Sequence, residues 1–543
     1  PVRTTVPQGY LNAAANSAGA ALVGLFERNE SGRGQLIDVS AQASLLQSTM
    51  SMVLADPFRA PQASRMAGGY TVPPLDIKMV WTCQDGMVTV TFMFGLSVGF
   101  FTKRLMEWVH EEGFCSDEML ATDWVRFSAQ VQSGEETIEK YEQIKETLQT
   151  FLLTKTKAEL LEASLERGLL IAPITTIADV ADSPQLADRD FWEDVERADG
   201  TTERHCGPIA KFGATPLAPL SPAPLPGADT IAIRREPRRH LSLRTPDVAP
   251  EAPLAGMKVL DFTWAMAGPA ATRVLADYGA TVIRVETAVK IEAARQLQPF
   301  LNAKIDNEGS GVFLNLNVNK LGVAINLADE ASRDVVHDLI RWADVVAESF
   351  TPGVMADWGY GYDAIRAVNP GVVMFQSALM GQTGPLRDFA GYGNLSAAIC
   401  GFYNVTGWPD RWPTGPYVAY TDYVSPWFTL PVLLAAFDHK RRTGEGQLID
   451  FSQMEASLYM LGSAFTEYFE TGAIVERQGN RDPQMAPHGV FPTSGDDEWI
   501  AIAIDSDEAW ASLCTIAGFD PALAELSVAQ RLARAEEVEE LLA

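Results

Sequence analysis

One ten-residue motif occurs twice in this chain of 543 residues, and the repeat constrains the fold more than any other feature. Residues 31–40 read SGRGQLIDVS and residues 443–452 read TGEGQLIDFS, an offset of 412 positions from residue 31 to residue 443. In both places the motif follows one apolar helical pattern and precedes another. Solenoid repeats have periods of about 20 to 50 residues, so this offset predicts two copies of a domain-sized unit.

The similarity between the copies continues beyond the motif. Residues 81–92 (WTCQDGMVTVTF) and residues 491–504 (FPTSGDDEWIAIAI) both read as a turn followed by an alternating strand. Between the copies lies a proline-rich segment, residues 216–256, which is typical of an extended and semi-rigid connector.

Composition excludes several function classes. The chain is 47% hydrophobic and 21% charged, as globular proteins are. Its 42 basic and 70 acidic residues give a net charge of −28, which disfavours binding to nucleic acids or anionic membranes. The longest apolar runs, such as residues 427–437, are too short to span a bilayer. Five scattered cysteines without CxxC spacing favour a reducing cytoplasm, and six dispersed histidines predict no bound metal.

After the linker the pattern alternates between strands and helices. Near-continuous apolar strands alternating with helices predict an α/β fold with a doubly wound, mostly parallel sheet. Ligands of such sheets bind at the carboxyl ends of the strands. The predicted strands are residues 257–262, 280–286, 321–327, 344–350 and 371–377, and the predicted helices are residues 268–279 and 332–343.

The turn after the first of these strands reads TWAMAGPAA and does not match GxGxxG, so a nicotinamide dehydrogenase is disfavoured. Gly268 at the helix start could offer backbone N–H groups to an anion, or could simply make a tight turn.

Asp422 is the single carboxylate in PYVAYTDYVSPW, residues 416–427, and precedes a predicted helix over residues 425–440. With an ordinary pKa of about 3.9 it would be ionised at neutral pH, and the helix dipole would support that state. A carboxylate is a competent covalent nucleophile. Aspartate is also a favoured N-cap, so capping is the alternative interpretation.

Several motifs together, in order and spacing, resemble the class III (family III) CoA-transferases, the group that includes carnitine-CoA and formyl-CoA transferases. The resemblance covers residues 254 to about 513, and residues 8–216 resemble the back portion of a second unit. The motifs are residues 254–286, ESFTPGVMADWG (348–359), GQTGPLRDFAGYG (381–393), TDYVSP (421–426) with RRTGEGQLIDFSQMEASL (441–458), and RQGNRDPQMAPHGVFPT (477–493).

The resemblance implies a Rossmann-like large domain and a smaller α/β domain in each unit, and an interlocked dimer of units. Two fused units would build this dimer-like body within one chain, while a further homodimer is left open. The implied division is the back portion of unit one at residues 1–215, the linker at 216–256, the large domain of unit two at 257–475 and the start of its small domain at 476–543. On this interpretation the front of unit one and the tail of unit two are missing.

The resemblance also implies that Asp422 is the nucleophile that carries coenzyme A, taken from an acyl-CoA substrate, with no metal. Shifted by the repeat offset, Asp422 falls on Tyr10, and residues 1–20 contain no Asp or Glu. We therefore expect one covalent site, in unit two.

By the same resemblance, three groups of residues surround the nucleophile. Met266 and Thr287 stand where the formyl-CoA branch has a glutamine and a CoA-contacting arginine, so the acyl donor and the acceptor acid do not carry over. The implied groups are a lid with oxyanion donors (Gly479, Asn480, Gly489), coenzyme A contacts (Met266, Ala267, Gly268, Glu286, Thr287, Trp358, Arg387) and a substrate pocket (Tyr392, Tyr423, Trp427).

Three alternative functions share features with this sequence. A racemase of this fold would need a histidine where Tyr392 stands, and a phenol has a pKa near 10. A tandem CoA-transferase and lyase acting on dimethylsulfoniopropionate would share the fused architecture, and aromatic side chains would suit its sulfonium group. A non-catalytic acyl-CoA binding scaffold would form no covalent adduct. The aromatic residues near Asp422 in sequence are Trp408, Trp412, Tyr420, Tyr423 and Trp427.

Overall fold

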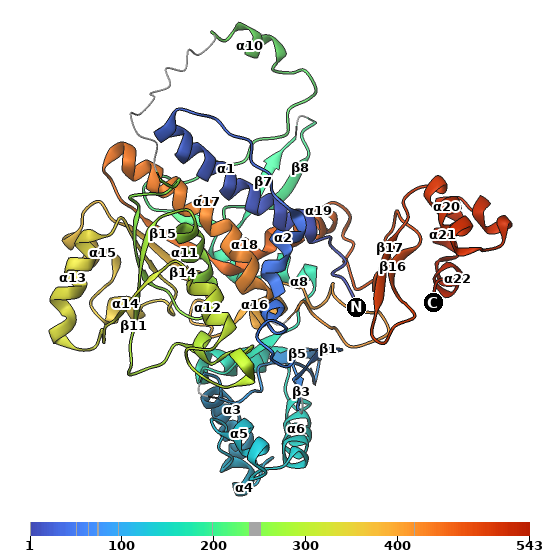
Figure 1. The fold of residues 1–543 in the computed structure, drawn as a ribbon, viewed down its shortest axis with the longest axis horizontal. Helices are drawn as coiled ribbons and strands as arrows, with labels where there is room; N and C mark the ends of the chain where they lie inside the picture. The colour runs from blue at the N-terminus through green and yellow to red at the C-terminus, as the bar shows by residue number, and fades with distance from the viewer. Residues whose placement is uncertain are drawn as a thin grey trace.

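The computed structural model describes residues 2–49, 51–62, 64–72, 75–95, 97–197, 199–237, 251–417 and 419–543. Its largest sheet has seven strands in the order β12-β11-β10-β13-β14-β15-β9 (Figure 1). The strands are β9 (Ala210–Phe212), β10 (Lys258–Phe262), β11 (Thr281–Glu286), β12 (Leu321–Ala324), β13 (Val345–Glu348), β14 (Val373–Ala378) and β15 (Leu448–Ser452).

Six of these strands are parallel, and β9 pairs antiparallel with β15. The chain first forms the edge strand β9 and then the central strand β10. It adds β11 and β12 on one side of β10, and then β13, β14 and β15 on the other side, where β15 pairs with β9. The predicted doubly wound α/β fold is therefore confirmed, and the strand order reverses between β10 and β13. A sheet of this kind forms its ligand crevice at that point.

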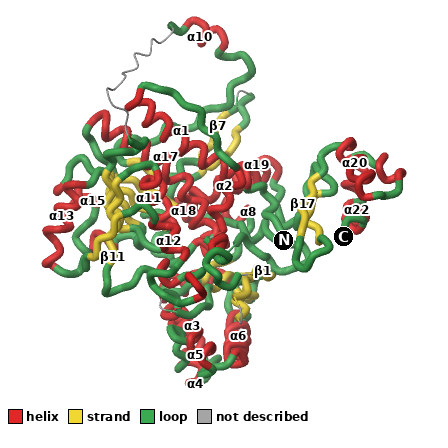
Figure 2. Tube along the Cα trace, in the orientation of Figure 1, coloured by secondary structure: helices red, strands yellow, loops and turns green. Residues whose placement is uncertain are grey.

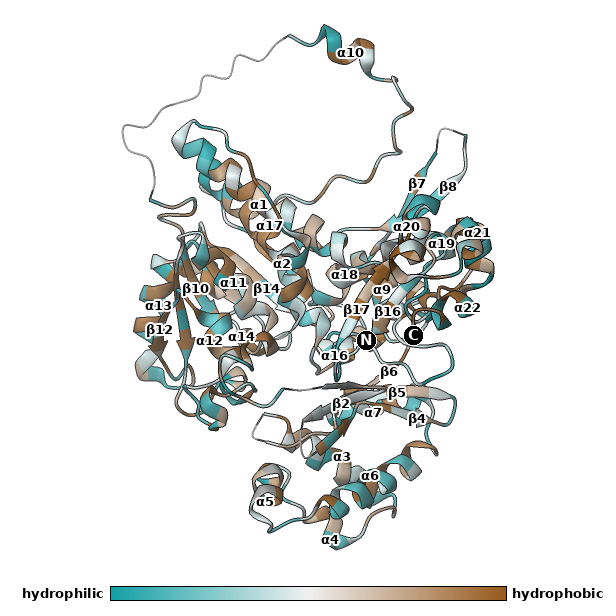
Figure 3. Ribbon diagram, turned by 45° about the vertical axis from the view of Figure 1, so that its right-hand side comes forward, coloured by the Kyte–Doolittle hydropathy of each residue, from teal (hydrophilic) through white to brown (hydrophobic). Residues whose placement is uncertain are grey.

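Helices cover both faces of the sheet because alternate strand residues point in opposite directions. Val259, Val345 and Val373 pack against α11 (Ala267–Asp277) and α17 (Tyr420–Thr443). Their neighbours Leu260, Val346 and Met374 pack against α13 (Arg333–Trp342) and α15 (Tyr362–Val368). Figure 3 shows hydrophobic residues concentrated in this sheet and in α11 and α17.

Helix α1 (Gly9–Ser31), from the first copy of the repeat, packs along α17, its counterpart in the second (Figure 1). A Cβ on Gly19 would lie 2.6 Å from Leu430 Cδ2, so a larger residue there would require the Leu430 side chain to move. The rings of Phe26 and Phe437 stack with centroids 5.8 Å apart. The two copies are thus joined by direct helix packing.

Residues 64–173 form a second lobe with its own core around Trp81, Trp124 and Tyr141. Strands β5 and β6 of this lobe contact α16 (Gly393–Ile399), and Asn394 Nδ2 donates to Thr91 Oγ1 at 2.9 Å. The lobe therefore packs against the large sheet domain. Its elements are β1 (Ser64–Met66), β2 (Gly69–Val72), β3 (Leu75–Lys78), β4 (Val80–Cys83), β5 (Gly86–Val90), α3 (Gly99–Glu111), α4 (Asp117–Leu120), α5 (Phe127–Ser133), α6 (Ile138–Leu152), α7 (Lys157–Arg167) and β6 (Ile171–Pro173).

The C-terminal residues form a third lobe, at the right of Figure 1, around a small core of Trp510, Cys514 and Val538. It consists of β16 (His488–Pro492), β17 (Trp499–Ala503), α20 (Asp507–Ala517), α21 (Val528–Ala533) and α22 (Ala535–Glu540). The remaining elements are α2 (Ala41–Leu46), α8 (Ile177–Ala181), α9 (Pro184–Asp188), β7 (Trp192–Glu196), β8 (Thr202–Cys206), α10 (Thr230–Arg235), α12 (Gly311–Asn317), α14 (Val354–Asp357), α18 (Gln453–Leu458) and α19 (Gly462–Thr471).

Residues 216–225 of the proline-rich linker form no helix or strand and lead to the short helix α10 (Figure 2). Residues 238–250 of this segment lie outside the described residues. Within the described part of the chain, none of the helices has the length and apolar content that a membrane span requires.

Candidate active site

Asp422 is the third residue of α17 and only 5% exposed. The helix begins at Tyr420, five residues before the predicted start, so Asp422 lies inside the first turn. Ala419 is the N-cap residue, and the capping interpretation of Asp422 is therefore wrong. The carboxylate instead accepts one hydrogen bond at each oxygen, from the Gly393 N–H to Oδ2 at 3.0 Å and from the Gln453 amide to Oδ1.

Three elements converge on this carboxylate. Gly393 is the first residue of α16, and a Cβ there would lie 2.8 Å from the Asp422 carboxyl carbon, so only glycine permits the approach. Thr421 Oγ1 donates to the Gly393 carbonyl at 3.0 Å and fixes α17 against α16. Gln453 opens α18 directly after strand β15. Contacts between segments far apart in sequence therefore position the side chain.

Burial raises the pKa of Asp422 to about 6, although the hydrogen bonds from Gln453 and Gly393 lower it. The expectation of an ordinary pKa supported by the helix dipole is therefore wrong, because desolvation outweighs the donors. At pH 7 the carboxylate is still ionised by about ten to one. A desolvated carboxylate that remains ionised has the character of an available nucleophile.

Asp422 and Gln453 line a cavity of about 550 Å³. The cavity lies at the carboxyl ends of four strands, and it is lined by Phe262 of β10, Glu286 of β11, Ser349 after β13 and Ala378 of β14. This is the crevice at the reversal of strand order, where doubly wound sheets bind ligands.

Most of the residues predicted around the nucleophile line this same cavity. Eight of them come from separate segments over residues 266–392, which the parallel sheet brings to one edge. They are Met266, Ala267, Gly268, Glu286, Thr287, Trp358, Arg387 and Tyr392.

Tyr423 and Trp427, predicted in the substrate pocket, do not line this cavity. Successive residues of an α-helix point about 100° apart, so Tyr423 faces away from the side of α17 that carries Asp422. It packs beside Met266 and Ala419, and Trp427, one turn further on, packs in another cluster. The prediction from proximity in sequence is corrected by helix geometry.

Gly479, Asn480 and Gly489, predicted as a lid, also lie away from the cavity. A Cβ on Gly479 would meet the Trp408 ring at 2.3 Å, and Asn480 Oδ1 accepts the Arg3 N–H at 2.9 Å. Residues 476–543 are all described, and none of them lines the cavity, because they fold as the separate third lobe. Their role as a lid stays a prediction.

Many residues at the site were not predicted from the sequence, and five of them bear on its chemistry. Gly393 and Gln453 hold the carboxylate, and Lys290, Phe101 and Leu170 line the cavity. The repeat carried a signal for Gln453, since the equivalent position in the first copy is Ala41. Phe101 and Leu170 carried no such signal, because only the packing of the second lobe brings them to the cavity.

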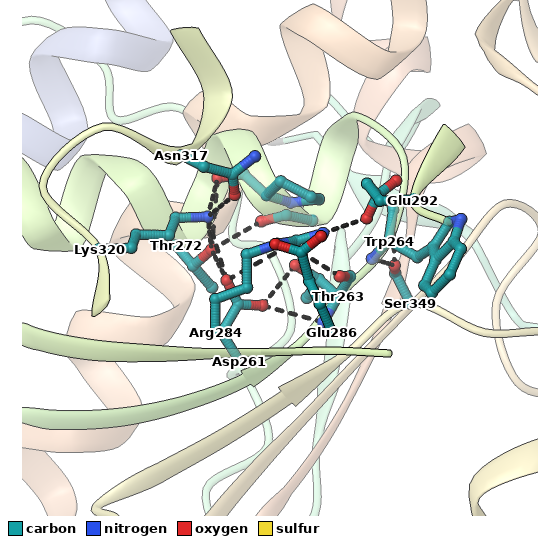
Figure 4. Close-up of polar contacts among 12 residues, drawn as sticks. Asp261, Thr263, Trp264, Thr272, Arg284, Glu286, Glu292, Asn317, Lys320 and Ser349 are labelled. Atoms are coloured by element: carbon teal, nitrogen blue, oxygen red, sulfur yellow. Dashed lines mark hydrogen bonds and ion pairs between the residues drawn. The ribbon is translucent and has the colours of Figure 1, made fainter. Parts of the chain in front are cut away.

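A buried charged network supports the wall formed by the loop after β10 (Figure 4). Arg284 pairs with Glu292 and donates to the Thr263 carbonyl at 3.0 Å. Glu292 accepts the N–H of Ala265 at 3.0 Å, and Ala265 has a positive φ of 62° that a non-glycine residue rarely adopts.

On the other side of the same network, Lys320 Nζ lies 3.0 Å from Asp261 Oδ2 (Figure 4). Burial opposes the charge on Asp261, but Lys320 and Arg284 hold its pKa below the usual value. The network therefore fixes the strained loop at the cavity edge.

The family model of CoA-transferase family III matches residues 1–230 and again residues 254–543. This chain belongs to CoA-transferase family III. The predicted family is confirmed, and so is the prediction that the chain is a transferase enzyme.

Named relatives of this family III chain are CoA-transferases. Succinyl-CoA–D-citramalate CoA-transferase of Chloroflexus aurantiacus is 33% identical over 293 residues, 54% of this chain and 71% of the relative. Succinate–glutarate CoA-transferase of Agrobacterium fabrum is 32% identical over 268 residues, 49% of this chain and 66% of the relative. Acetyl-CoA:oxalate CoA-transferase of Acetobacter aceti is 32% identical over 275 residues, 50% of this chain and 69% of the relative.

A solved structure is also similar to this family III chain. The crystal structure of a CaiB/BaiF family protein from Brucella suis has a TM-score of 0.50 and 29% identity, and the match covers 54% of this chain and 78% of that protein.

Proposed function

We propose that this chain moves coenzyme A from an acyl-CoA to a carboxylic acid through a covalent intermediate on Asp422. The observation that carries the proposal is the buried, hydrogen-bonded carboxylate at the inner end of a cavity in the sheet crevice. The relatives' names, which are those of CoA-transferases, support the same reaction class.

The first half of the proposed reaction loads coenzyme A onto the protein. An Asp422 oxygen attacks the thioester carbon, the C–S bond breaks, and a mixed anhydride and CoA thiolate form. The thiolate then attacks the Asp422 carbonyl carbon, and the donor acid leaves as its carboxylate. The product is an aspartyl-CoA thioester, and no electron is gained or lost.

The second half reverses these steps with the acceptor. The acceptor carboxylate attacks the aspartyl thioester and releases the thiolate, and the thiolate attacks the acceptor carbonyl of the new anhydride. Asp422 leaves as a carboxylate, ready for another cycle. Burial of Asp422 favours this sequence because water would hydrolyse either intermediate.

We assign the two donors to Asp422 a role in both halves. While Asp422 is a carboxylate, the Gly393 N–H and the Gln453 amide orient it. When its carbonyl carbon is attacked, negative charge develops on an oxygen that these donors already face. Preorganised donors of this kind stabilise an oxyanion.

We propose that coenzyme A enters past the exposed side of the cavity. Arg387 and Lys290 are exposed cations there, suited to phosphate groups, and Trp358 offers an indole face. The assignment of Met266, Ala267, Gly268, Glu286 and Thr287 to coenzyme A contacts remains part of the same proposal. The proposed contacts between these residues and an acyl-CoA involve no metal ion.

We also propose an assembly and a cellular location for the protein. The close packing of α1 on α17 supports a dimer-like body built within one chain. The domain division at residues 215, 256 and 475 and a cytoplasmic location are retained as proposals, as are the absence of nucleic-acid and membrane partners.

The alternatives have less support. Burial raises the pKa of Tyr392 to about 12, so its phenol is a poor base, and no histidine is among the described residues that line the cavity. A racemase is thereby disfavoured. The proposed sulfonium site relied on Trp408, Trp412, Tyr420, Tyr423 and Trp427, and none of these lines the cavity.

Trapping the intermediate tests the proposal. The full chain is incubated with acetyl-, butanoyl- and succinyl-CoA, treated with hydroxylamine, and digested for mass spectrometry. We expect a hydroxamate at Asp422 that is absent from Asp422→Asn. Asp438→Asn is the matched control, since Asp438 lies on the same helix in an exposed pair with Arg442. Coenzyme A binding without modification of Asp422 would favour the non-catalytic scaffold.

A further inference from the structure

The cations that line the cavity are exposed, whereas its nucleophile is buried. The charged residues among the described lining are Glu286, Lys290, Arg387 and Asp422. Lys290 and Arg387 are exposed, whereas Asp422 is buried. Positive charge therefore lies at the solvent side, and the inner end holds a single carboxylate.

No cation neutralises Asp422 within the part of the chain that the structure describes. Its pKa is raised by burial, and the groups that oppose the rise are the neutral donors Gln453 and Gly393. Two buried cations of the network behind the loop after β10 are already paired, Arg284 with Glu292 and Lys320 with Asp261 (Figure 4). Neither is available to a second carboxylate in the cavity.

The inner wall is apolar instead. Leu170, Phe389, Phe101, Leu379 and Tyr392 line the cavity and belong to one hydrophobic cluster. Leu170 and Phe389 are each 3% exposed. The pKa of Tyr392 is raised mainly by burial and, to a smaller extent, by the negative charge of Asp422. Tyr392 and the apolar wall to which it belongs therefore lie close to the nucleophile.

We infer that the acyl groups transferred through Asp422 are those of monocarboxylic acids with an uncharged chain, aliphatic or aromatic. This inference rests on the proposed function. A dicarboxylic acid attached at Asp422 would bury its second carboxylate against apolar side chains without a cation beside it, which is strongly unfavourable. The protein would thus differ from relatives whose names include succinate, glutarate and oxalate.

Two specificity residues come from the second lobe. Phe101 lies on α3 and Leu170 directly before β6, and both line the cavity across from the strand ends of the large sheet. They contact the acyl chain in this proposal, while Asp422 forms and breaks the bonds. A positive charge at residue 101 would supply the cation that a dicarboxylic acyl group lacks.

The test compares adduct formation at Asp422 from butanoyl-CoA, succinyl-CoA and carnitinyl-CoA, using the full chain and mass spectrometry with hydroxylamine. In each case the thioester C–S bond breaks as the bond to the Asp422 oxygen forms. We expect kcat/KM for adduct formation to be at least about tenfold higher with butanoyl-CoA than with either charged acyl-CoA.

The variant Phe101→Arg should lower the butanoyl-to-succinyl ratio by about tenfold or more. Phe100→Arg is the matched control, because Phe100 is the adjacent, exposed residue of α3 that does not line the cavity, and its ratio should match the wild type. Circular dichroism and thermal unfolding check that both variants fold. If Phe101→Arg does not fold, the wild-type ratio alone decides.

Equal or preferred reaction with succinyl-CoA or carnitinyl-CoA in the wild type overturns the inference and leaves the proposed function standing. An unchanged ratio in folded Phe101→Arg overturns the assignment of Phe101. No adduct from any of the three acyl-CoAs, with acetyl-CoA also unreactive, overturns the proposed function and this inference with it.

Discussion

Residues 31–40 and residues 443–452 share seven of ten residues, yet their structures differ. The later segment forms β15 between β14 and β9, with Ile449 fully buried. The earlier segment forms no strand with any described residue, and its Leu36 is 95% exposed. A strand needs hydrogen-bonding neighbours, so the same local sequence is a strand in one environment and an exposed segment in another.

The helices before the two motifs show the complementary behaviour. Both α1 and α17 form, because helical hydrogen bonds are made within the segment itself. Their first turns differ, however: Asp422 is buried in the cavity, whereas the equivalent Tyr10 is 84% exposed. Gln453, which holds Asp422, is likewise replaced by Ala41. The comparison predicts one working site and one structural copy.

The largest expected effect separates the two copies by activity. Asp422→Asn should lower turnover by about a thousandfold or more, because it removes the nucleophile. Tyr10→Phe should leave turnover unchanged, since Tyr10 lies in the exposed first turn of α1. Steady-state rates with a reactive acyl-CoA and acceptor measure both. Comparable losses in the two variants would mean that the first copy also takes part in catalysis.

The next largest effect concerns the contact between the copies. Arg189, from the first copy, is fully buried and pairs with Asp450, at 2.8 Å, and with Glu455 of the second copy. Arg189→Ala should lower the free energy of unfolding by about 3–5 kcal/mol, because two buried carboxylates lose their cation. Arg204→Ala, in an exposed pair with Asp194, should cost about 0–1 kcal/mol. If urea unfolding gave the same loss of unfolding free energy for Arg189→Ala and Arg204→Ala, the two copies would not be joined through Arg189.

A matched pair of core substitutions sharpens the contrast within the motif. Ile449→Ala should cost about 2–4 kcal/mol of unfolding free energy because it leaves a cavity between the sheet and its helices. Ile37, at the equivalent position of the first copy, is 40% exposed. Ile37→Ala should therefore lower the free energy of unfolding by less than about 1 kcal/mol. Denaturant midpoints at constant m-value give both numbers. A loss at residue 37 as large as at residue 449 would show that the first motif is packed in solution.

The smallest effect concerns the residue that the first copy lacks. Adduct formation in the wild type should rise with pH through about 6, the pKa of Asp422, because only the ionised carboxylate attacks. Gln453→Leu removes a donor to that ionised form, so the midpoint should move upward by about one pH unit, or about 1.4 kcal/mol. Single-turnover rates from pH 5 to 9 measure the midpoint. A midpoint that stayed in place or moved downward would rule out this role for Gln453.

Much of the fold could be predicted from local patterns. The strands predicted at residues 257–262 and 280–286 are β10 and β11, shifted by one residue at the start, because buried parallel strands are continuous apolar runs. The start of α17 was placed five residues late, since Asp422 is of a favoured N-cap type and the observed N-cap residue, Ala419, is not. The first turn packs against α16, a contact that local pattern does not encode.

The site could be predicted only in part. The motifs identified Asp422 and eight cavity residues, whose positions follow from the order of the parallel strands. The motifs gave no information on side-chain direction, so Tyr423 and Trp427 were placed in the pocket although they face elsewhere. The lid residues lie away from this cavity, with Gly479 beside Trp408, and their role as a lid stays a prediction.

The sequence by itself determined the family, the repeat, the alternating strands and helices, and the loss of the carboxylate from the first copy, since each is written in residue type and local spacing. Only the tertiary structure decided that burial raises the pKa of Asp422, that Gly393 and Gln453 hold it, and that Phe101 and Leu170 close the cavity. The physical reason is that desolvation and packing depend on which distant segments meet, and local pattern does not encode those contacts.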